Sequence, residues 1–243
     1  MTPIHLLILS LAQGLSEFLP VSSTGHLNLL QSFFGQTPSL SLDVFLNTAT
    51  LFSVLYFFRG QIKFFLANLN YIIVGTLPAA VFGLLFRSQF EVIYSRPDLL
   101  PLFFLITSLL VFLTKLLKNH HLPLNYPRAF IIGLFQALAI LPGVSRSAAT
   151  IFAALLLGLS SENAFKFSFS LFIPASLGAL FLDARRLAWV SLAPLSLFSF
   201  LLAFFSGILA LHLLYRFLTS RRFWYFSIYT FILSLALFTF LRS

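Results

Sequence analysis

The sequence predicts an all-α integral membrane protein with about six transmembrane helices and two re-entrant helical hairpins. Of its 243 residues, 59% are hydrophobic and only 9% are charged, whereas about a quarter of the residues in a soluble domain carry charge. Several apolar runs, rich in Phe and Leu, are long enough to cross a hydrocarbon layer about 30 Å thick. Runs such as 194–214 lack the period-two alternation of a transmembrane β-barrel.

Composition also excludes several kinds of site and partner. The chain has no Cys, which excludes disulfides, thiolate metal sites and a Cys nucleophile. Its net charge of +9 comes from Lys and Arg at the ends of apolar runs. That placement is typical of topology signals and contacts with anionic lipid headgroups, so we expect a bilayer and not nucleic acid as the partner.

Two of the apolar segments are interrupted. The stretch 3–12 is too short to span a membrane and is separated by polar residues from a second short segment at 25–34. Segments 128–141 and 145–157 form a similar pair. Each pair predicts a re-entrant hairpin, because irregular backbone at membrane depth must be surrounded by protein.

The remaining apolar segments have the length of membrane spans. Three spans are expected after each interrupted pair, at 42–58, 69–86 and 99–117 and then at 163–182, 192–214 and 223–241.

A shift of 123 residues aligns the two interrupted pairs. It places Gln13 on Gln136 and Ser22 on Ser145. Because an odd number of spans separates the pairs, the second copy would start on the opposite side of the membrane, as in an inverted-topology repeat. We therefore expect a single membrane domain over 1–243, with two related halves at roughly 1–120 and 121–243.

The basic residues indicate an orientation. If each hairpin enters and leaves on one side, eight basic residues share the expected cytoplasmic face and five share the outer face. The inner set is Arg59, Lys63, Lys115, Lys118, Arg128, Arg216, Arg221 and Arg222, and the outer set is Arg87, Arg96, Arg185, Arg186 and Arg242.

The polar residues of the first interruption, 13–26, form what we call the first island. Gln13 and Glu17 are four residues apart and share a helix face. Pro20 ends that helix, and Ser22, Ser23 and Thr24 are suitable N-caps for the next one. His26 follows within one turn of these hydroxyl groups.

The second island covers 141–150. Pro142 and Gly143 break the chain, and Ser145 is the expected cap of a half-helix whose N-terminus suits a phosphate. Arg146 adds a guanidinium fork that matches phosphate oxygens, and Ser147 and Thr150 can donate further hydrogen bonds.

Together the islands indicate phosphoryl chemistry. Arg146 would hold the anion, while Glu17 or His26 would transfer protons and a hydroxyl group or water would attack. Because a carboxylate repels a diphosphate, we expect a divalent cation between Glu17 and the substrate, assisted by Gln13. Two simpler interpretations stay open: Glu17 and Arg146 form a structural ion pair, or the hydroxyl groups only pack and bond to backbone.

Asp43 is a further candidate. Asp43 and Asn47 lie at the start of a span, spaced four residues apart. Asp43 either lines the site and binds substrate or caps the helix at the membrane interface. Ser168 and Pro174 in the second half are candidates to line the same cavity.

The two islands resemble the signatures of the undecaprenyl-pyrophosphate phosphatase family, the bacitracin-resistance phosphatases of bacteria. The matching residues are Gln13 and Glu17, the run Phe18 to His26, the run Pro142 to Ser147, and Thr150. The resemblance covers nearly the whole chain.

The resemblance implies a multi-pass hydrolase of the bacterial inner membrane. Its activity would be removal of one phosphate from undecaprenyl diphosphate, which recycles the carrier lipid for cell-wall synthesis. It also implies an inverted repeat, a site open to the periplasmic side and dependence on Mg²⁺ or Ca²⁺. The essential groups of the family fall on Glu17, Ser23, His26, Ser145, Arg146 and Thr150.

One position departs from many members of the family, which have Glu where this chain has Gln13. Glu17 is then the main carboxylate of the expected metal site. The sequence does not decide between Ser23, His26 and water as nucleophile, nor whether the protein forms a homodimer. A transporter or flippase without hydrolysis is the alternative function, since inverted repeats with broken helices are typical of transporters.

Overall fold

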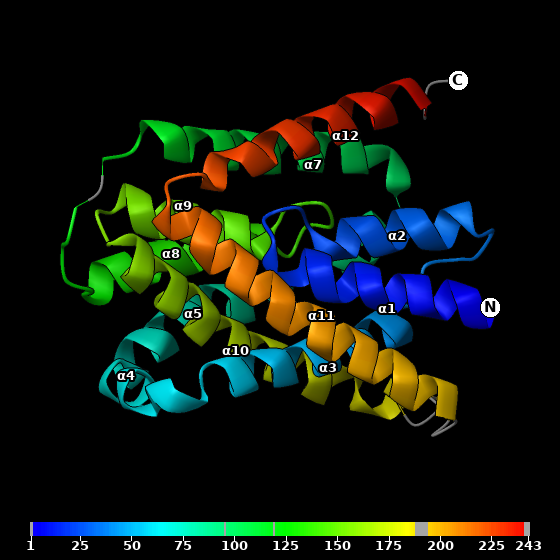
Figure 1. Cartoon of the computed structure of the whole chain (residues 1–243), viewed down its shortest axis with the longest axis horizontal. Helices are drawn as coiled ribbons and strands as arrows, with labels where there is room; N and C mark the ends of the chain where they lie inside the picture. The colour runs from blue at the N-terminus through cyan, green and yellow to red at the C-terminus, as the bar shows by residue number, and fades with distance from the viewer. Residues whose placement is uncertain (1, 95, 119, 188–193, 241–243) are drawn as a thin grey trace.

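The computed structural model describes residues 2–94, 96–118, 120–187 and 194–240, and every regular element among them is helical (Figure 1). The all-α prediction is therefore confirmed. The first two residues of the expected span 192–214, the last residue of 223–241 and Arg242 lie outside the described residues.

Both interrupted pairs form helical hairpins. Their helices begin at side chains that accept hydrogen bonds from backbone N–H groups of the first turn: Thr2, Ser22, Asn125 and Ser145. The first hairpin is α1 (Pro3–Phe18) with α2 (Ser23–Phe33), and the second is α8 (Tyr126–Leu138) with α9 (Arg146–Leu156).

Six longer helices match the six expected spans. They are α3 (Leu40–Phe57), α5 (Leu69–Leu85), α7 (Leu100–Leu113), α10 (Ser161–Leu187), α11 (Pro194–Thr219) and α12 (Phe226–Phe240). Among the described residues, four segments are long and apolar enough to cross a membrane alone, and two bent helix pairs raise the number to six. The protein is thus a multi-pass membrane protein.

The bent pairs contain elements that the sequence did not predict. α3 continues through η1 (Arg59–Gln61) into α4 (Ile62–Ala67), and α5 continues into α6 (Arg87–Tyr94).

α11 also extends five residues beyond the predicted end at 214. The other short 3-10 helices are η2 (Pro97–Leu99), η3 (Thr114–Leu116) and η4 (Phe223–Tyr225).

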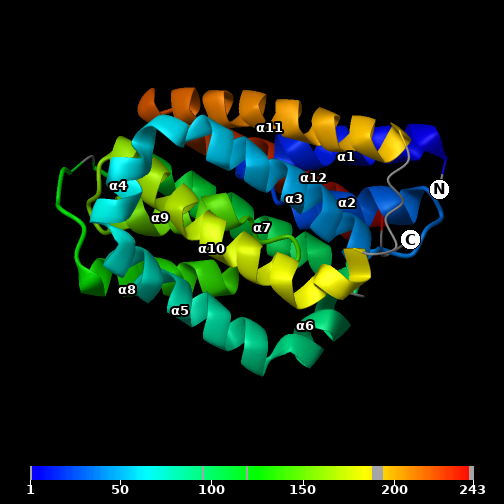
Figure 2. The ribbon, with the colours of Figure 1, turned by 90° about the horizontal axis from the view of Figure 1, so that it is seen from below.

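The two hairpins enter the bundle from opposite ends, and their tips lie in its middle (Figures 1 and 2). Their packing partners correspond: α1 packs on α11, and α8 packs on α5. In each case the partner is the second long helix of the other half. The first long helices, α3 and α10, pack together, as do the third, α7 and α12. This exchange is the packing of an inverted-topology repeat. The division into related halves at 120/121 stays a prediction.

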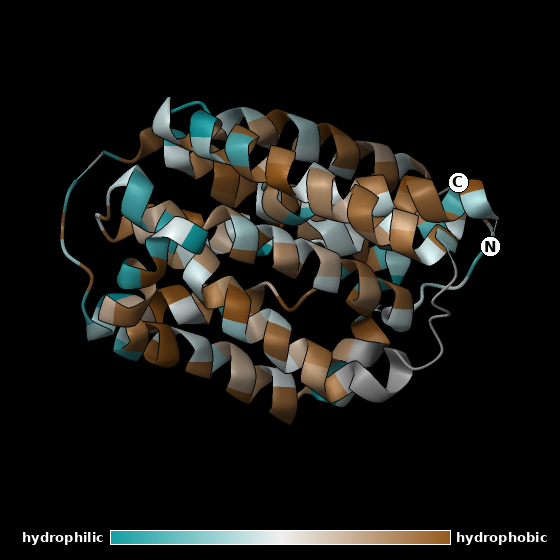
Figure 3. Ribbon diagram, turned by 60° about the horizontal axis from the view of Figure 1, so that its bottom comes forward, coloured by the Kyte–Doolittle hydropathy of each residue, from teal (hydrophilic) through white to brown (hydrophobic). Residues whose placement is uncertain are grey.

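Close helix contacts fix the depth of each hairpin. A Cβ atom at Gly133 of α8 would overlap the backbone of Gly75 in α5, and one at Gly14 of α1 would overlap Ser206 of α11. Apolar residues cover most of the helix lengths, whereas hydrophilic residues gather mainly toward the two ends of the bundle (Figure 3). The hairpin tips are therefore held at membrane depth by tight glycine contacts.

Candidate active site

The tips of the two hairpins touch each other. A Cβ atom at Gly25 of α2 would lie 3.2 Å from Gly143 Cα in the turn between α8 and α9. Thr107 of α7 supports that turn, because its hydroxyl group donates to the Gly143 carbonyl (2.8 Å) and accepts from the Ser145 N–H (3.0 Å). The two islands thus meet, as the sequence predicted.

Both tips contain left-handed backbone. Gly143 has φ = +100°, and Ser22, the N-cap of α2, has φ = 68°. A positive φ is costly for a residue with a side chain and is concentrated at functional sites. Here it turns the chain sharply enough to begin α2 beside the end of α1, which places Ser23 next to Glu17.

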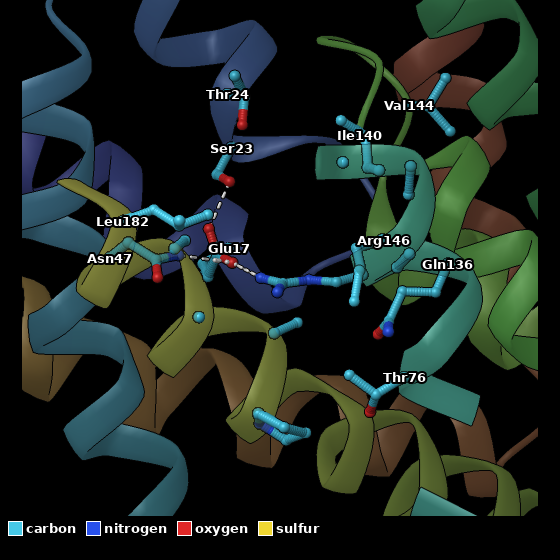
Figure 4. A pocket seen from close by; sticks show the side chains of 18 of the residues that line it. Glu17, Ser23, Thr24, Asn47, Thr76, Gln136, Ile140, Val144, Arg146 and Leu182 are labelled. Carbon is cyan, nitrogen blue, oxygen red and sulfur yellow. Dashed lines mark hydrogen bonds and ion pairs between the residues drawn. The ribbon is translucent and has the colours of Figure 1, made fainter. Parts of the chain in front are cut away.

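Glu17 is the centre of the site (Figure 4). Its Oε2 accepts hydrogen bonds from Gln13 Nε2 (2.9 Å) and Ser23 Oγ (2.5 Å). Its Oε1 accepts from Asn47 Nδ2 (3.2 Å) and pairs with Arg146 Nη2. The carboxylate side chain is only 5% exposed, so these donors replace the water that a buried charge needs.

Arg146 is held by three different elements. It is the first residue of α9, its guanidinium pairs with Glu17 of α1, and its Nη1 lies 3.4 Å from Ser176 Oγ of α10. Its Cζ lies 4.0 Å from the centre of the Phe172 ring, a cation–π contact. The guanidinium thus points from the N-terminus of α9 toward the first hairpin. The dipole of α9 stabilises an anion bound at this helix N-terminus.

Two cavities adjoin this ion pair. The larger, of about 530 Å³, is lined by both hairpin tips and by α5, α8 and α10. The smaller, of about 360 Å³, also reaches Asp43 of α3 and Arg87 and Tyr94 of α6. Glu17, Ser23, Thr24, Asn47 and Arg146 line both. An anion bound beside Arg146 could therefore extend into the larger cavity in one direction and into the smaller cavity in the other.

The comparisons with known proteins decide the family. Residues 6–236 match the family described as bacitracin resistance protein BacA. The chain belongs to this family. It is 38% identical to the undecaprenyl-diphosphatase of Thermosipho melanesiensis, over 94% of this chain and 96% of that protein. It is 39% identical to that of Thermosipho africanus, over 96% and 98%, and 36% identical to that of Methanococcus maripaludis strain C7, over 97% and 99%.

Within this BacA-family site, most of the predicted residues come together. Glu17, Ser22, Ser23, Thr24, Ser145 and Arg146 line the larger cavity, and Gln13 and Asp43 line the smaller. Asp43 accepts hydrogen bonds from Tyr94 Oη (2.5 Å) and Gln31 Nε2 (3.3 Å). Pro174 lines the larger cavity as predicted.

His26 does not line either cavity. Its Nδ1 lies 2.7 Å from the Ser22 carbonyl oxygen and its Nε2 lies 2.7 Å from Tyr229 Oη of α12. The carbonyl can only accept, so Nδ1 donates to it and a neutral ring accepts from Tyr229. The ring also stacks on Tyr229 and contacts the edge of Phe104. In this arrangement His26 stabilises the Ser22 turn through the bond to its carbonyl, and the catalytic role of His26 stays a prediction.

Three other predicted hydroxyl groups are also directed elsewhere. Ser147 bonds to Ser145 Oγ (3.1 Å) and donates to the Leu19 carbonyl (3.4 Å). Thr150 is 2.5 Å from Ser168 Oγ and donates to the Arg146 carbonyl (2.8 Å). None of Ser147, Thr150 and Ser168 lines either of these two cavities. Their hydrogen bonds connect α9 to the first hairpin and to α10. The substrate-binding roles of Ser147 and Thr150 stay predictions.

Among the polar residues that line the cavities or hold Arg146, five had no site role predicted from the sequence: Thr76, Arg87, Tyr94, Gln136 and Ser176. Two of them carried a usable signal. Gln136 is the repeat equivalent of Gln13 at the 123-residue offset, and Ser176 is two residues from Pro174. Tyr94 lies on α6, which was not predicted as a helix, and Thr76 lies in a span with no other polar group nearby.

The oxygen groups around Glu17 suit a cation only in part. Beside the carboxylate lie the amide groups of Gln13 and Asn47 and the hydroxyl of Ser23. No group of three or more His, Cys, Asp or Glu residues among those described could hold a metal ion. Mg²⁺ typically binds through one or two carboxylates, substrate phosphates and water. The donor set therefore fits a cation whose coordination the substrate completes.

Proposed function

We propose that the protein hydrolyses undecaprenyl diphosphate to undecaprenyl phosphate and inorganic phosphate, which returns the carrier lipid to bacterial cell-wall synthesis. The observation that carries the proposal is the contact of Glu17 with both Ser23 and Arg146 at a cavity inside an apolar bundle. This arrangement places a nucleophile beside a base and an anion-binding group beside both.

The diphosphate binds where Arg146 now pairs with Glu17. The guanidinium fork and the N-terminus of α9 stabilise its charge. Thr24 and Ser145 line the same space. The substrate competes with Glu17 for Arg146, so binding releases the carboxylate to act as a base.

Ser23 is the nucleophile in this proposal. Its hydroxyl group already donates to Glu17 Oε2, the geometry of a nucleophile with its base. The Ser23 oxygen attacks the terminal phosphorus, its proton passes to Glu17, and the bond from that phosphorus to the bridging oxygen breaks. Undecaprenyl phosphate leaves, and water then hydrolyses the phosphoserine to inorganic phosphate and free Ser23.

A divalent cation, Mg²⁺ or Ca²⁺, would be held by Glu17 and Gln13 together with the phosphates. Such a cation neutralises phosphate charge during transfer. Gln13 fits this role as a neutral ligand, because its amide nitrogen faces Glu17 and its amide oxygen remains for a cation.

The isoprenoid tail lies in the apolar part of the larger cavity. Beyond the polar groups, this cavity is lined by Ala80, Gly83 and Leu84 of α5 and by Gly178 and Phe181 of α10. Phe181 is 83% exposed and Leu84 is 59% exposed, so the cavity continues toward the lipid-facing surface between these helices.

Release of phosphate separates hydrolysis from transport. The purified protein in detergent should release inorganic phosphate from undecaprenyl diphosphate when Mg²⁺ is present, and chelation of the metal should stop the release. Ser23→Ala and Glu17→Gln should each reduce the rate at least a hundredfold. A folded wild-type protein that binds the lipid but releases no phosphate would indicate the transporter or flippase instead.

We further propose that the site opens to the outer side of the bacterial inner membrane. The smaller cavity reaches α6, which carries Arg87 of the predicted outer set. Helix α6 and the C-terminal end of α11 lie at opposite ends of the bundle (Figure 2). Because the chain has no Cys, Gln89→Cys on α6 and Ser220→Cys directly after α11 each provide a single thiol. An impermeant maleimide should label only Gln89→Cys in right-side-out vesicles. Labelling of only Ser220→Cys would reverse the orientation.

A further inference from the structure

Gln136 is a buried amide with no hydrogen-bond partner. It lies in the last turn of α8, is 2% exposed and lines the larger cavity. Neither its Nε2 nor its Oε1 has a partner among the described residues. Buried side-chain amides are nearly always hydrogen-bonded, so an unpaired one that faces a cavity indicates a ligand.

The surroundings of Gln136 hold the amide in this place. Directly before it, α8 packs on α5 through Gly133 and Gly75, which are in backbone contact. Thr76, the next polar residue on that wall, donates its hydroxyl hydrogen to the Ile72 carbonyl (2.7 Å). Figure 4 shows Gln136 and Thr76 beside the Arg146 side chain, on the side away from Ser23 and Thr24.

Gln13, the repeat equivalent of Gln136, shows what the unpaired amide lacks. The Gln13 amide nitrogen donates to the Glu17 carboxylate (2.9 Å). At the 123-residue offset Glu17 corresponds to Ile140, which has no acceptor. The amide nitrogen of Gln136 therefore lacks the anion that its counterpart has, while the positive charge of Arg146 lies in the same cavity (Figure 4).

The position of Gln136 identifies the part of the ligand that reaches it. Gln136 lines the larger cavity but not the smaller one. Of the two cavities, only the larger includes Leu84 and Phe181, the exposed apolar residues through which it continues toward the lipid-facing surface. Asp43, Arg87 and Tyr94 line only the smaller cavity. A ligand group at Gln136 is thus an anion attached to an apolar chain.

We propose that Gln136 binds the phosphate that carries the isoprenoid tail, with its Nε2 donating to a non-bridging oxygen of that phosphate. This inference rests on the proposed function and deepens it. The tail-bearing phosphate lies between Gln136 and Arg146, and the terminal phosphate lies toward Ser23 and the smaller cavity. The asymmetry of the two walls thereby sets the direction in which the diphosphate enters.

Binding of the two reaction products tests this assignment. In Gln136→Met, which keeps the length of the side chain and removes both polar amide atoms, the dissociation constant of undecaprenyl phosphate should rise about tenfold or more. Inorganic phosphate should inhibit the variant as it inhibits the wild type, because it occupies the terminal position. In the hydrolysis assay, KM should rise by a similar factor with a smaller change in kcat.

A matched variant separates this role from a structural one. Gln89→Met removes an exposed amide on α6 and should leave both affinities unchanged. Unchanged binding of undecaprenyl phosphate to a folded Gln136→Met, or an equal loss for both products, would overturn the assignment. Since binding is measured without turnover, these outcomes are distinct from failure of the proposed hydrolysis, which the wild type alone would show.

Discussion

Glu17 accepts hydrogen bonds from four side chains that lie on four helices, α1, α2, α3 and α9. A carboxylate inside an apolar bundle would be strongly destabilised without such donors. Arg146 supplies the compensating charge, and Gln13, Ser23 and Asn47 supply neutral donors. The same donors can serve a phosphate, so the site without substrate already has the hydrogen-bonding groups that substrate requires. Under the proposed function, Glu17 is the internal anion that the diphosphate would replace at Arg146.

Arg146→Lys tests whether the shape of the cation matters as well as its charge. Lysine keeps the charge but loses the guanidinium fork and the flat face that lies on Phe172. We expect kcat/KM for undecaprenyl diphosphate to fall about a hundredfold, with the free energy of unfolding lowered by about 1 kcal/mol. Phosphate release and thermal unfolding in detergent measure the two effects.

Arg96→Lys is the matched control for this substitution. Arg96 also pairs with a carboxylate, that of Asp98, but 57% of its side chain is exposed. Exposed ion pairs contribute little, so activity and stability should stay at wild-type values. Full activity in Arg146→Lys would mean that only the charge is needed, and the fork would then have no role.

At the scale of elements, both hairpins could be predicted because Pro and Gly interrupt apolar runs that are too short to span. The geometry of the hairpin tips could not be predicted from the sequence. The positive φ of Ser22 occurs where Gly25 meets Gly143 and where Tyr229 of α12 holds the His26 ring that bonds to the Ser22 carbonyl. The contacts with Gly143 and Tyr229 join residues that are far apart in the sequence. For the same reason the place of His26 in the first island did not predict that its ring is directed at Tyr229. Residue type and spacing identify the groups of a site but not the direction of each side chain.

Gly143→Ala tests the tip of the second hairpin. The alanine residue would have to adopt φ = +100°, and its methyl group would lie 2.7 Å from Phe103 Cβ. We expect the free energy of unfolding to fall by about 1–3 kcal/mol. Activity should fall as well, since the displaced turn carries Ser145 and Arg146. Thermal unfolding and phosphate release, measured on the same sample, report both changes.

Gly60→Ala serves as the control at a position where a Cβ atom meets nothing within 4 Å. It should match the wild type in both measurements. If Gly143→Ala were equally harmless, the turn would be able to relax without moving Arg146, and the glycine would not be needed for the geometry of the site.

At the scale of the whole molecule, the inverted packing brings two dissimilar tips together. The number of spans predicted this arrangement. With three spans between the hairpins, the second hairpin enters the membrane from the side opposite to the first. The bends after α3 and α5 were missed, since α4 and α6 are short helices without the length of a span. α6 matters for function, because it adds Arg87 and Tyr94 to the smaller cavity. The cavities themselves depend on how far apart α5 and α10 lie, which periodicity does not encode.

The passage between α5 and α10 provides a test on this scale. Gly178 of α10 lines the larger cavity, and a Cβ atom there would meet nothing within 4 Å. Gly178→Leu should therefore fold normally and fill the apolar arm. We expect KM for undecaprenyl diphosphate to rise about tenfold, the effect of excluding a few methylene groups, while KM for a short-chain diphosphate such as isopentenyl diphosphate changes little. Parallel kinetics with the two substrates measure the ratio, with Gly60→Leu as the control. An equal rise in KM for both substrates would mean that the isoprenoid tail binds elsewhere and that only the diphosphate headgroup is affected by the filled arm.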